Sequence, residues 1–166
     1  MKVSSAFQPS RFPGVEFFNN FDSILVDFNL PPDTLNRLFE LNCGKRFFIE
    51  PTSLFKIFGR HHLIAQAECC FPNLEELLTI QHCTINEKEE PDYDTIAAKT
   101  KDLKNSNDLK TEIFEICKSI NMPNYFIVTV AEKGAFYGKP YLFLSGVIPG
   151  ASLLKHLSYE RKNSSL

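Results

Sequence analysis

The chain has 166 residues, a formal net charge of −2, 43% hydrophobic residues and 23% charged residues. These values exclude wholesale disorder, which requires low hydrophobicity and high net charge. They also exclude an overall basic field for nucleic acid or an anionic membrane, and no apolar run approaches the ~20 residues of a membrane-spanning helix.

Residues 1–20 predict an irregular arm, because prolines and a glycine interrupt regular structure there. The first ten residues lack the apolar segment of a secretory signal. Phe12, Phe17 and Phe18 make the arm too apolar for a free tail. We therefore expect the arm to pack against the domain or against a partner.

Residues 23–83 predict a β-α-β unit followed by further helices. The strands are expected at Ser23–Leu30 and Arg46–Glu50. The helix between them has apolar residues at helical spacing and Asp33 as its expected N-cap. The stretch 61–71 suits a strand or a helix equally, and Asn73–Ile80 predicts a helix.

Residues 87–94 predict an exposed acidic loop, because the run is charged and contains a proline. Residues 95–157 predict a helix-hairpin-helix block, with its main helix at 108–121 and strands at Tyr125–Val130 and Tyr141–Leu144. The first of these strands is apolar on both faces, which predicts a central place in the sheet. Residues 158–166 are expected to form a frayed tail.

These elements predict one α+β domain over residues 1–166. We expect a single compact domain in which a mixed or mostly antiparallel sheet of about four to six strands carries helices packed mainly on one face.

Cysteine and histidine provide the candidates for metal binding. The weak candidates are His61, Cys69, His82 and Cys83. Their spacing lacks the paired ligands of zinc ribbons and fingers, so semi-buried thiols and surface imidazoles are the favoured interpretation, and we predict no metal and no cofactor. The same residues could supply a Cys–His nucleophile pair, but no flanking signature supports one. The five cysteines, an odd number, argue against a disulfide framework.

Charged residues provide two further candidates. The acidic residues of the 87–94 loop lack the spacing of a calcium-binding loop and predict a solvated surface. Lys99, Lys101, Lys104 and Lys110 could contact a phosphate backbone, although Asp102 and Asp108 interrupt the set.

One segment resembles a known family. Ile116-Cys117, Asn121, the strand Tyr125–Val130 and the turn Glu132–Gly134 resemble the helix–strand segment of schlafen-type domains, which include RNA-cleaving members. Pro123-Asn124 replaces the Gly-Gly that precedes the strand in that family, and its paired glutamates have no counterpart here. The resemblance implies an RNA-processing role and carries over no catalytic residue.

None of these candidate sets has the spacing of a known catalytic site. We therefore predict a non-catalytic protein that acts as an interaction, adaptor or regulatory subunit through an apolar, Phe-rich surface. We expect it to be intracellular and soluble, in the cytoplasm or the nucleus. An enzyme is the less favoured class. The expected contact residues are Phe12, Phe17, Phe18, Phe55, Phe58, Phe136 and Tyr137. The alternatives are a domain that binds a small apolar ligand and a schlafen-like RNA-processing or RNA-binding subunit. The expected partner is another protein, with nucleic acid second, no membrane, and a homo-oligomer left open.

Overall fold

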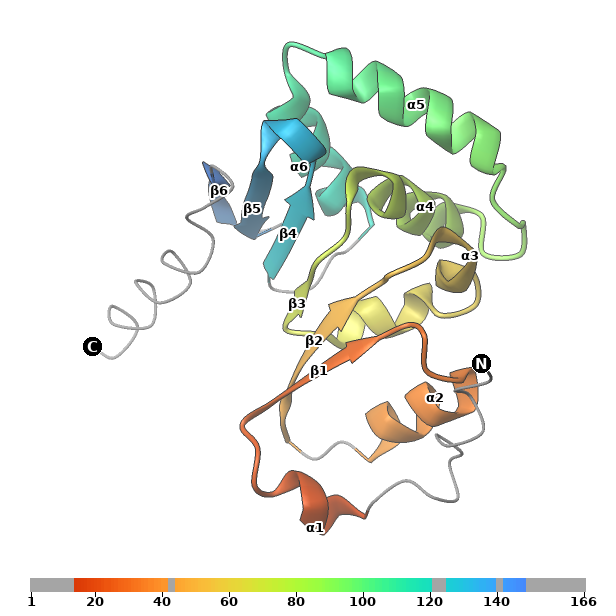
Figure 1. Ribbon diagram of the computed structural model, residues 1–166, viewed down its shortest axis with the longest axis vertical. Coiled ribbons are helices and arrows are strands. Elements are labelled where there is room, and N and C mark those ends of the chain that lie inside the picture. The colour runs from red at the N-terminus through yellow and green to blue at the C-terminus, as the bar shows by residue number, and fades with distance from the viewer. Residues whose placement is uncertain (1–13, 42–43, 121–124, 140–141, 149–166) are drawn as a thin grey trace.

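Within the described residues, six strands form one mixed sheet in the order β1-β2-β3-β4-β5-β6 (Figure 1). The structure is a computed structural model that describes residues 14–41, 44–120 and 125–139, and the backbone of 142–148. The strands are β1 (Ser23–Asp27), β2 (Arg46–Glu50), β3 (Cys69–Cys70), β4 (Tyr125–Thr129), β5 (Ala135–Lys139) and β6 (Leu142–Ile148). β1 to β4 pair in parallel, and β4, β5 and β6 pair antiparallel. The predicted mixed sheet is confirmed.

The helices and 3₁₀ turns lie mostly in the connections between the parallel strands. They are α1 (Val15–Phe18), α2 (Pro32–Glu40), α3 (Leu54–Ile57), the 3₁₀ turn η3 (His61–Gln66), α4 (Leu74–Ile85), α5 (Tyr93–Asn105), α6 (Leu109–Ser119) and the 3₁₀ turn η4 (Ala131–Lys133). The prediction that Asp33 caps α2 is wrong, because the helix already begins at Pro32 and Asp33 lies in its first turn. Proline suits the first helical position, where its missing N–H costs no hydrogen bond.

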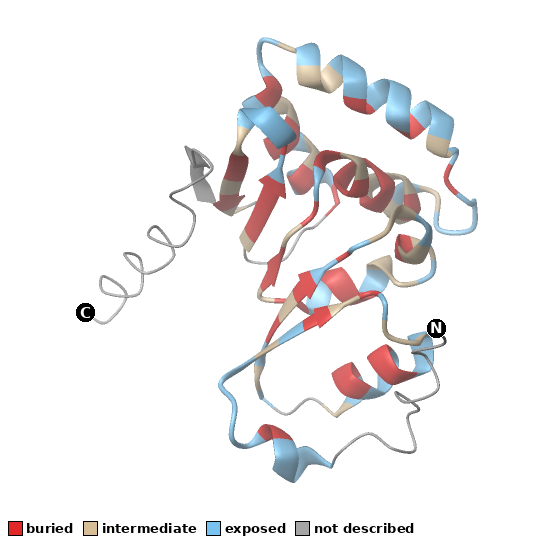
Figure 2. Ribbon diagram, in the orientation of Figure 1, coloured by how far each residue is buried: buried red, intermediate tan, exposed pale blue. Residues whose placement is uncertain are grey.

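The two faces of the sheet differ in size and cover. One face joins the helices in a large core that includes Phe47, Cys70, Phe126 and Val128. Cys69 and Ile127, their neighbours along the strands, belong to a small separate cluster on the other face. This alternation follows from the two-residue period of a strand. The predicted packing of helices on one face and the central place of β4 are both confirmed (Figure 2).

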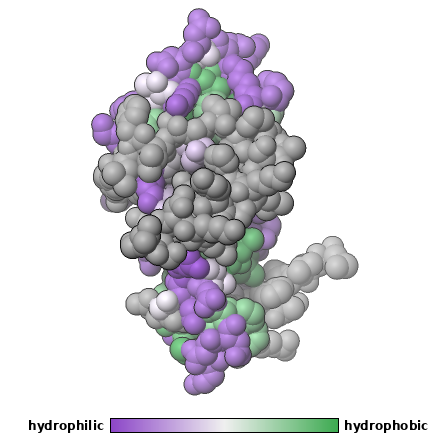
Figure 3. Space-filling view, turned by 90° about the vertical axis from the view of Figure 1, so that its left-hand side faces the viewer, coloured by the Kyte–Doolittle hydropathy of each residue, from purple (hydrophilic) through white to green (hydrophobic). Residues whose placement is uncertain are grey.

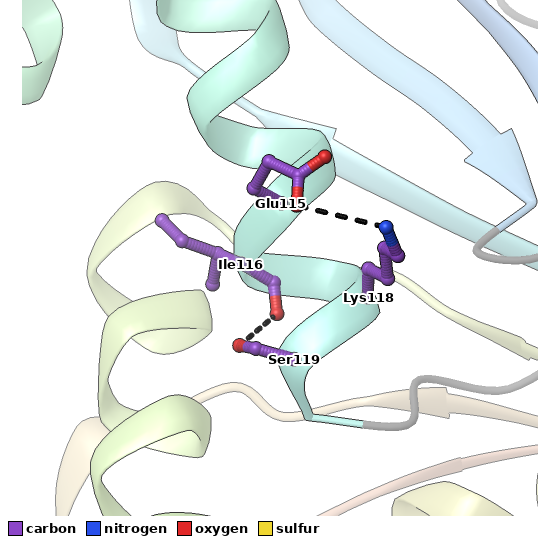
Figure 4. Close-up of polar contacts among 4 residues, drawn as sticks. All are labelled: Glu115, Ile116, Lys118 and Ser119. Carbon is purple, nitrogen blue, oxygen red and sulfur yellow. Dashed lines mark hydrogen bonds and ion pairs between the residues drawn. The ribbon is translucent and has the colours of Figure 1, made fainter.

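Polar contacts near the end of α6 lie within the helix, and one hydrogen bond joins it to α4. The Ser119 hydroxyl donates a hydrogen bond to the Ile116 carbonyl at 2.7 Å, and Lys118 and Glu115 form an exposed ion pair at 3.9 Å (Figure 4). Gln81 of α4 donates from Nε2 to the Ser119 hydroxyl at 3.2 Å. The apolar contacts of α6 with the core contribute far more, since exposed ion pairs contribute little.

The outer layer consists of α5, which lies across α4 (Figure 1). Only Ile96 and Thr100 of this helix are buried. Asp92, the last residue before the helix, caps it by accepting from the N–H groups of Asp94 and Thr95. The acidic loop predicted before it is largely exposed, except for Pro91.

Among the residues that the structure describes, none of the helices has both the length and the apolar character that crossing a lipid bilayer requires. The predicted tail at 158–166 and most of the predicted arm lie outside the described residues. The division of the chain into the predicted segments stays a prediction.

Leu77→Ala should lower the free energy of unfolding by about 2–5 kcal/mol, because the change leaves a cavity in the main core. Leu77 is fully buried on α4, whereas Leu25 on β1 is 66% exposed. Leu25→Ala is the matched control and should change stability little. Urea unfolding followed by circular dichroism measures both. Equal losses for the two variants would contradict the described core.

Candidate functional site at the carboxyl edge of the sheet

The parallel strands end together at one edge of the sheet. β1 ends at Asp27 and β2 at Glu50, and these two residues are register partners. Past β3, Asn73 pairs with Thr129 at the end of β4. Ligands of open parallel sheets bind outside the carboxyl ends of the strands. This edge is therefore the first place to look for chemistry.

A hydrogen-bond chain holds a cation beside the end of β1. Asp27 Oδ1 accepts from the Asn29 N–H at 2.7 Å. The Lys56 amine donates to Asn29 Oδ1, and Arg60 donates to the Lys56 carbonyl at 2.8 Å. The edge thus combines the Asp27 carboxylate at the end of β1, the Asn29 amide in the turn after it, and the Lys56 amine of α3.

The backbone is strained at two points along this edge. Thr52 follows β2 with φ 55°, and Ala131 follows β4 with φ 36°. Positive φ is unfavourable for residues that have a Cβ, above all for a β-branched one. Such strain clusters at functional sites, where surrounding structure maintains it. Both strained residues follow strands of the parallel set.

A buried carboxylate lies at the start of α4. Glu76 Oε2 accepts from the Asn73 N–H at 2.8 Å, and Asn73 Oδ1 accepts from the Glu76 N–H at 2.9 Å. This capping box begins the helix. Glu76 is 7% exposed, and burial raises the pKa of its carboxyl group. The Glu50 carboxylate raises that pKa further, while the Asn73 hydrogen bond lowers it.

The expected Phe-rich contact residues are spread over several elements. Phe17 and Phe55 are 52% and 70% exposed on α1 and α3, and Phe55 packs on Tyr93 with the ring centres 4.5 Å apart. Phe18 and Phe136 are buried in the main core, and Phe58 packs against it. Tyr137 borders the small cluster on the other face, and Phe12 lies outside the described residues. In the described part of the face in Figure 3, hydrophobic residues lie in small areas among hydrophilic ones.

The metal candidates are separated by the sheet. Cys69 lies in the small cluster on one face, whereas Cys83 on α4 lies in the main core. Within the described residues, His61 Nδ1 and His82 Nε2 are buried without a hydrogen-bond partner. No group of three or more His, Cys, Asp or Glu side chains in that part of the chain could hold a metal ion.

The buried thiols do not have the chemistry of nucleophiles. Burial is the larger cause, and the Glu68 carboxylate the smaller one, that together raise the pKa of Cys69 to about 12. Burial raises the pKa of Cys83 to about 11. A reactive cysteine requires a lowered pKa, because the thiolate is the nucleophile. These cysteines serve as small apolar side chains in the packing.

Sequence reasoning missed the polar residues of the carboxyl edge. The signal was present: Asp27, Glu50 and Asn73 each stand at or just after an apolar strand. The pattern gains meaning only if the three strands are parallel neighbours, since their carboxyl ends then meet.

Comparison with solved structures identifies the fold. A carbohydrate kinase from Agrobacterium tumefaciens has a TM-score of 0.53 at 18% identity, over 81% of this chain and 36% of that protein. Ribokinase from Giardia lamblia has a TM-score of 0.57 at 11% identity, over 91% and 48%. Adenosine kinase from Sinorhizobium meliloti has a TM-score of 0.53 at 11% identity, over 85% and 38%. The chain has a ribokinase-like fold.

The chain spans less than half the length of each of those three kinases. No protein-family model matches its sequence, and no curated protein matches it.

The predicted function is therefore corrected. A non-catalytic protein-interaction or regulatory subunit was expected, and the described fold is instead one found in carbohydrate kinases. The expectation was wrong because it relied on the number of Phe residues, many of which fill the core. The apolar-ligand and schlafen-like alternatives are set aside with it. The expectations about partners stay predictions.

The buried Glu76 carboxyl predicts a pH dependence of stability. Its pKa is raised in the folded state from an ordinary value of 4.5. Between the pKa of the unfolded chain and the raised pKa of the folded state, the folded protein holds a proton that the unfolded chain has released. The free energy of unfolding therefore falls as pH rises through this range. Glu76→Gln should flatten this fall.

Urea unfolding of both proteins between pH 4 and pH 7, roughly the range in which a raised glutamate titrates, provides the test. Glu89→Gln, at an exposed position in the loop after α4, is the control. An unchanged pH slope in Glu76→Gln would contradict the assignment.

Proposed function

We propose that the carboxyl edge takes part in phosphoryl transfer from a nucleoside triphosphate to a hydroxyl group of a sugar or nucleoside. The observation that carries this proposal is the coincidence of oxygen ligands, a lysine amine and backbone strain at the carboxyl edge of a ribokinase-like sheet. The chain spans less than half the length of the similar kinases, so the proposal concerns the part that this edge plays in the reaction.

In the proposed reaction, the acceptor hydroxyl oxygen bonds to the γ-phosphorus. The bond from that phosphorus to the bridging oxygen breaks, the nucleoside diphosphate leaves, and the hydroxyl proton passes to solvent or a base. Such transfer depends chiefly on positioning and on stabilising the phosphate charge. Lys56 would supply positive charge beside the end of β1.

The oxygen ligands at the edge fit a magnesium ion that arrives with a nucleotide. Mg²⁺ is usually held by one or two carboxylates together with substrate phosphates, so a complete protein cage is not required. Glu50 and Glu76 are close enough for their charges to interact, and Asn73 lies beside them in the capping box. When bound, the ion would neutralise charge on the phosphate oxygens.

The cysteines that the structure describes bear on the cellular compartment of the protein. Cys69, Cys70, Cys83 and Cys117 are free thiols. Free thiols persist in reducing surroundings. We accordingly propose the cytoplasm or the nucleus as the location.

A transfer assay tests the proposal. Purified protein, ATP and Mg²⁺ are incubated with ribose, fructose or adenosine, and phosphorylated product is measured by mass spectrometry. Glu50→Gln should lower kcat/KM by about 10–100-fold, the usual cost of disturbing a metal-site ligand or its support. Because Glu50 is exposed, the variant should remain folded.

Glu40→Gln is the matched control, an exposed glutamate at the end of α2 outside the edge, and should retain wild-type kinetics. Absence of ATP-dependent product with every acceptor, or equal kinetics of Glu50→Gln and wild type, would overturn the proposal.

A further inference from the structure

A groove of about 500 Å³ lies beside the carboxyl edge, between α5, the first turn of α4, and η4. Its charged and hydroxyl-bearing lining residues are Glu75, Thr100, Lys101, Lys104, Glu132 and Lys133. The turn η4 follows β4 directly, so the groove adjoins the strained residue Ala131. None of these six residues belongs to the proposed transfer site.

One hydroxyl in the groove lacks a hydrogen-bond partner within the described residues. A buried threonine in a helix commonly donates to the carbonyl four residues earlier. Thr79 and Thr84 of α4 do so, each at 2.8 Å. Thr100 of α5 is only 2% exposed, yet its Oγ1 has no such bond. A buried polar group without a partner costs stability, which a bound ligand atom would restore.

The lysines of the groove come from two elements that are tied together. The Lys133 amine donates a hydrogen bond to the Lys104 carbonyl, which joins η4 to the last turn of α5. Lys101 and Lys104 lie three residues apart, on neighbouring positions of one helical face. Lys99 of the same helix is exposed and does not line the groove.

The formal charge of the lining is positive. Three lysines against the two glutamates, Glu75 and Glu132, leave a formal charge of +1. An anion on the α5 side would meet two ammonium groups and the free hydroxyl together. Phosphate oxygens accept strong hydrogen bonds from such donors.

We propose that this groove binds the phosphate group of a small molecule through Lys101, Lys104 and Thr100. Two sources share that chemistry, a nucleotide and a phosphorylated sugar. The site goes beyond the proposed transfer reaction, because it would hold phosphate whether or not the carboxyl edge transfers it.

Isothermal titration with pyrophosphate at low salt tests the proposal. Lys101→Gln and Lys104→Gln should each weaken binding about tenfold, the expected effect of losing one charge-assisted hydrogen bond. Thr100→Val removes the hydroxyl while conserving side-chain shape, and should weaken binding without lowering the melting temperature. Lys99→Gln is the matched control on the same helix and should bind as the wild type does.

Parallel titrations with ADP and ribose 5-phosphate distinguish the sources, since the tighter ligand identifies which phosphate the groove accepts. Absence of pyrophosphate binding, or wild-type affinity in both Lys101→Gln and Lys104→Gln, would overturn the proposal. Loss of phosphoryl transfer with intact pyrophosphate binding would count against the transfer reaction alone, so the two proposals fail separately.

Discussion

The sheet depends on its shortest strand. β3 consists of Cys69 and Cys70 alone, yet it pairs with β2 on one side and β4 on the other. The flanking backbone extends these ladders: the Glu68 N–H donates to the Phe47 carbonyl at 2.7 Å, and the Tyr125 N–H donates to the Glu68 carbonyl at 3.0 Å. Among the described residues, β3 and its flanking backbone supply the hydrogen bonds that join the β1–β2 pair to the β4–β6 ladder. Cys70 is fully buried in the main core, where a larger side chain would disturb the close packing.

The parallel direction of this link creates the candidate site. It aligns the ends of β1, β2 and β4 and places Asn73 next to Thr129. The capping box of α4 then begins at the same edge, and the buried Glu76 lies near Glu50. The groove beside η4 is a second consequence, because η4 continues β4 and meets the end of α5. The proposed transfer site and the proposed phosphate groove therefore both depend on the parallel register of β3 with β2 and β4.

Local patterns predicted much of the fold. The sequence predicted the helix at 108–121 and the two apolar faces of β4, because apolar residues there recur with the period of a helix or a strand. The β-α-β unit was readable for the same reason, and the structure places β2 at the predicted residues. The stretch 61–71 could not be assigned, because its apolar residues suit either period. It forms a 3₁₀ turn and then the two-residue β3, whose pairing with distant strands makes it a strand.

The sequence by itself determined the period of each long element, the α+β character of the domain and the abundance of Phe, because these properties depend on residues close together in the chain. It did not determine the candidate site. Asp27, Glu50 and Asn73 are separated by more than twenty residues at each step, and only parallel pairing brings them to one edge. Tertiary structure also decided that Phe18 and Phe136 enter the core while Phe55 remains exposed. Burial depends on which side of an element meets its neighbour, and that is a property of the assembled sheet.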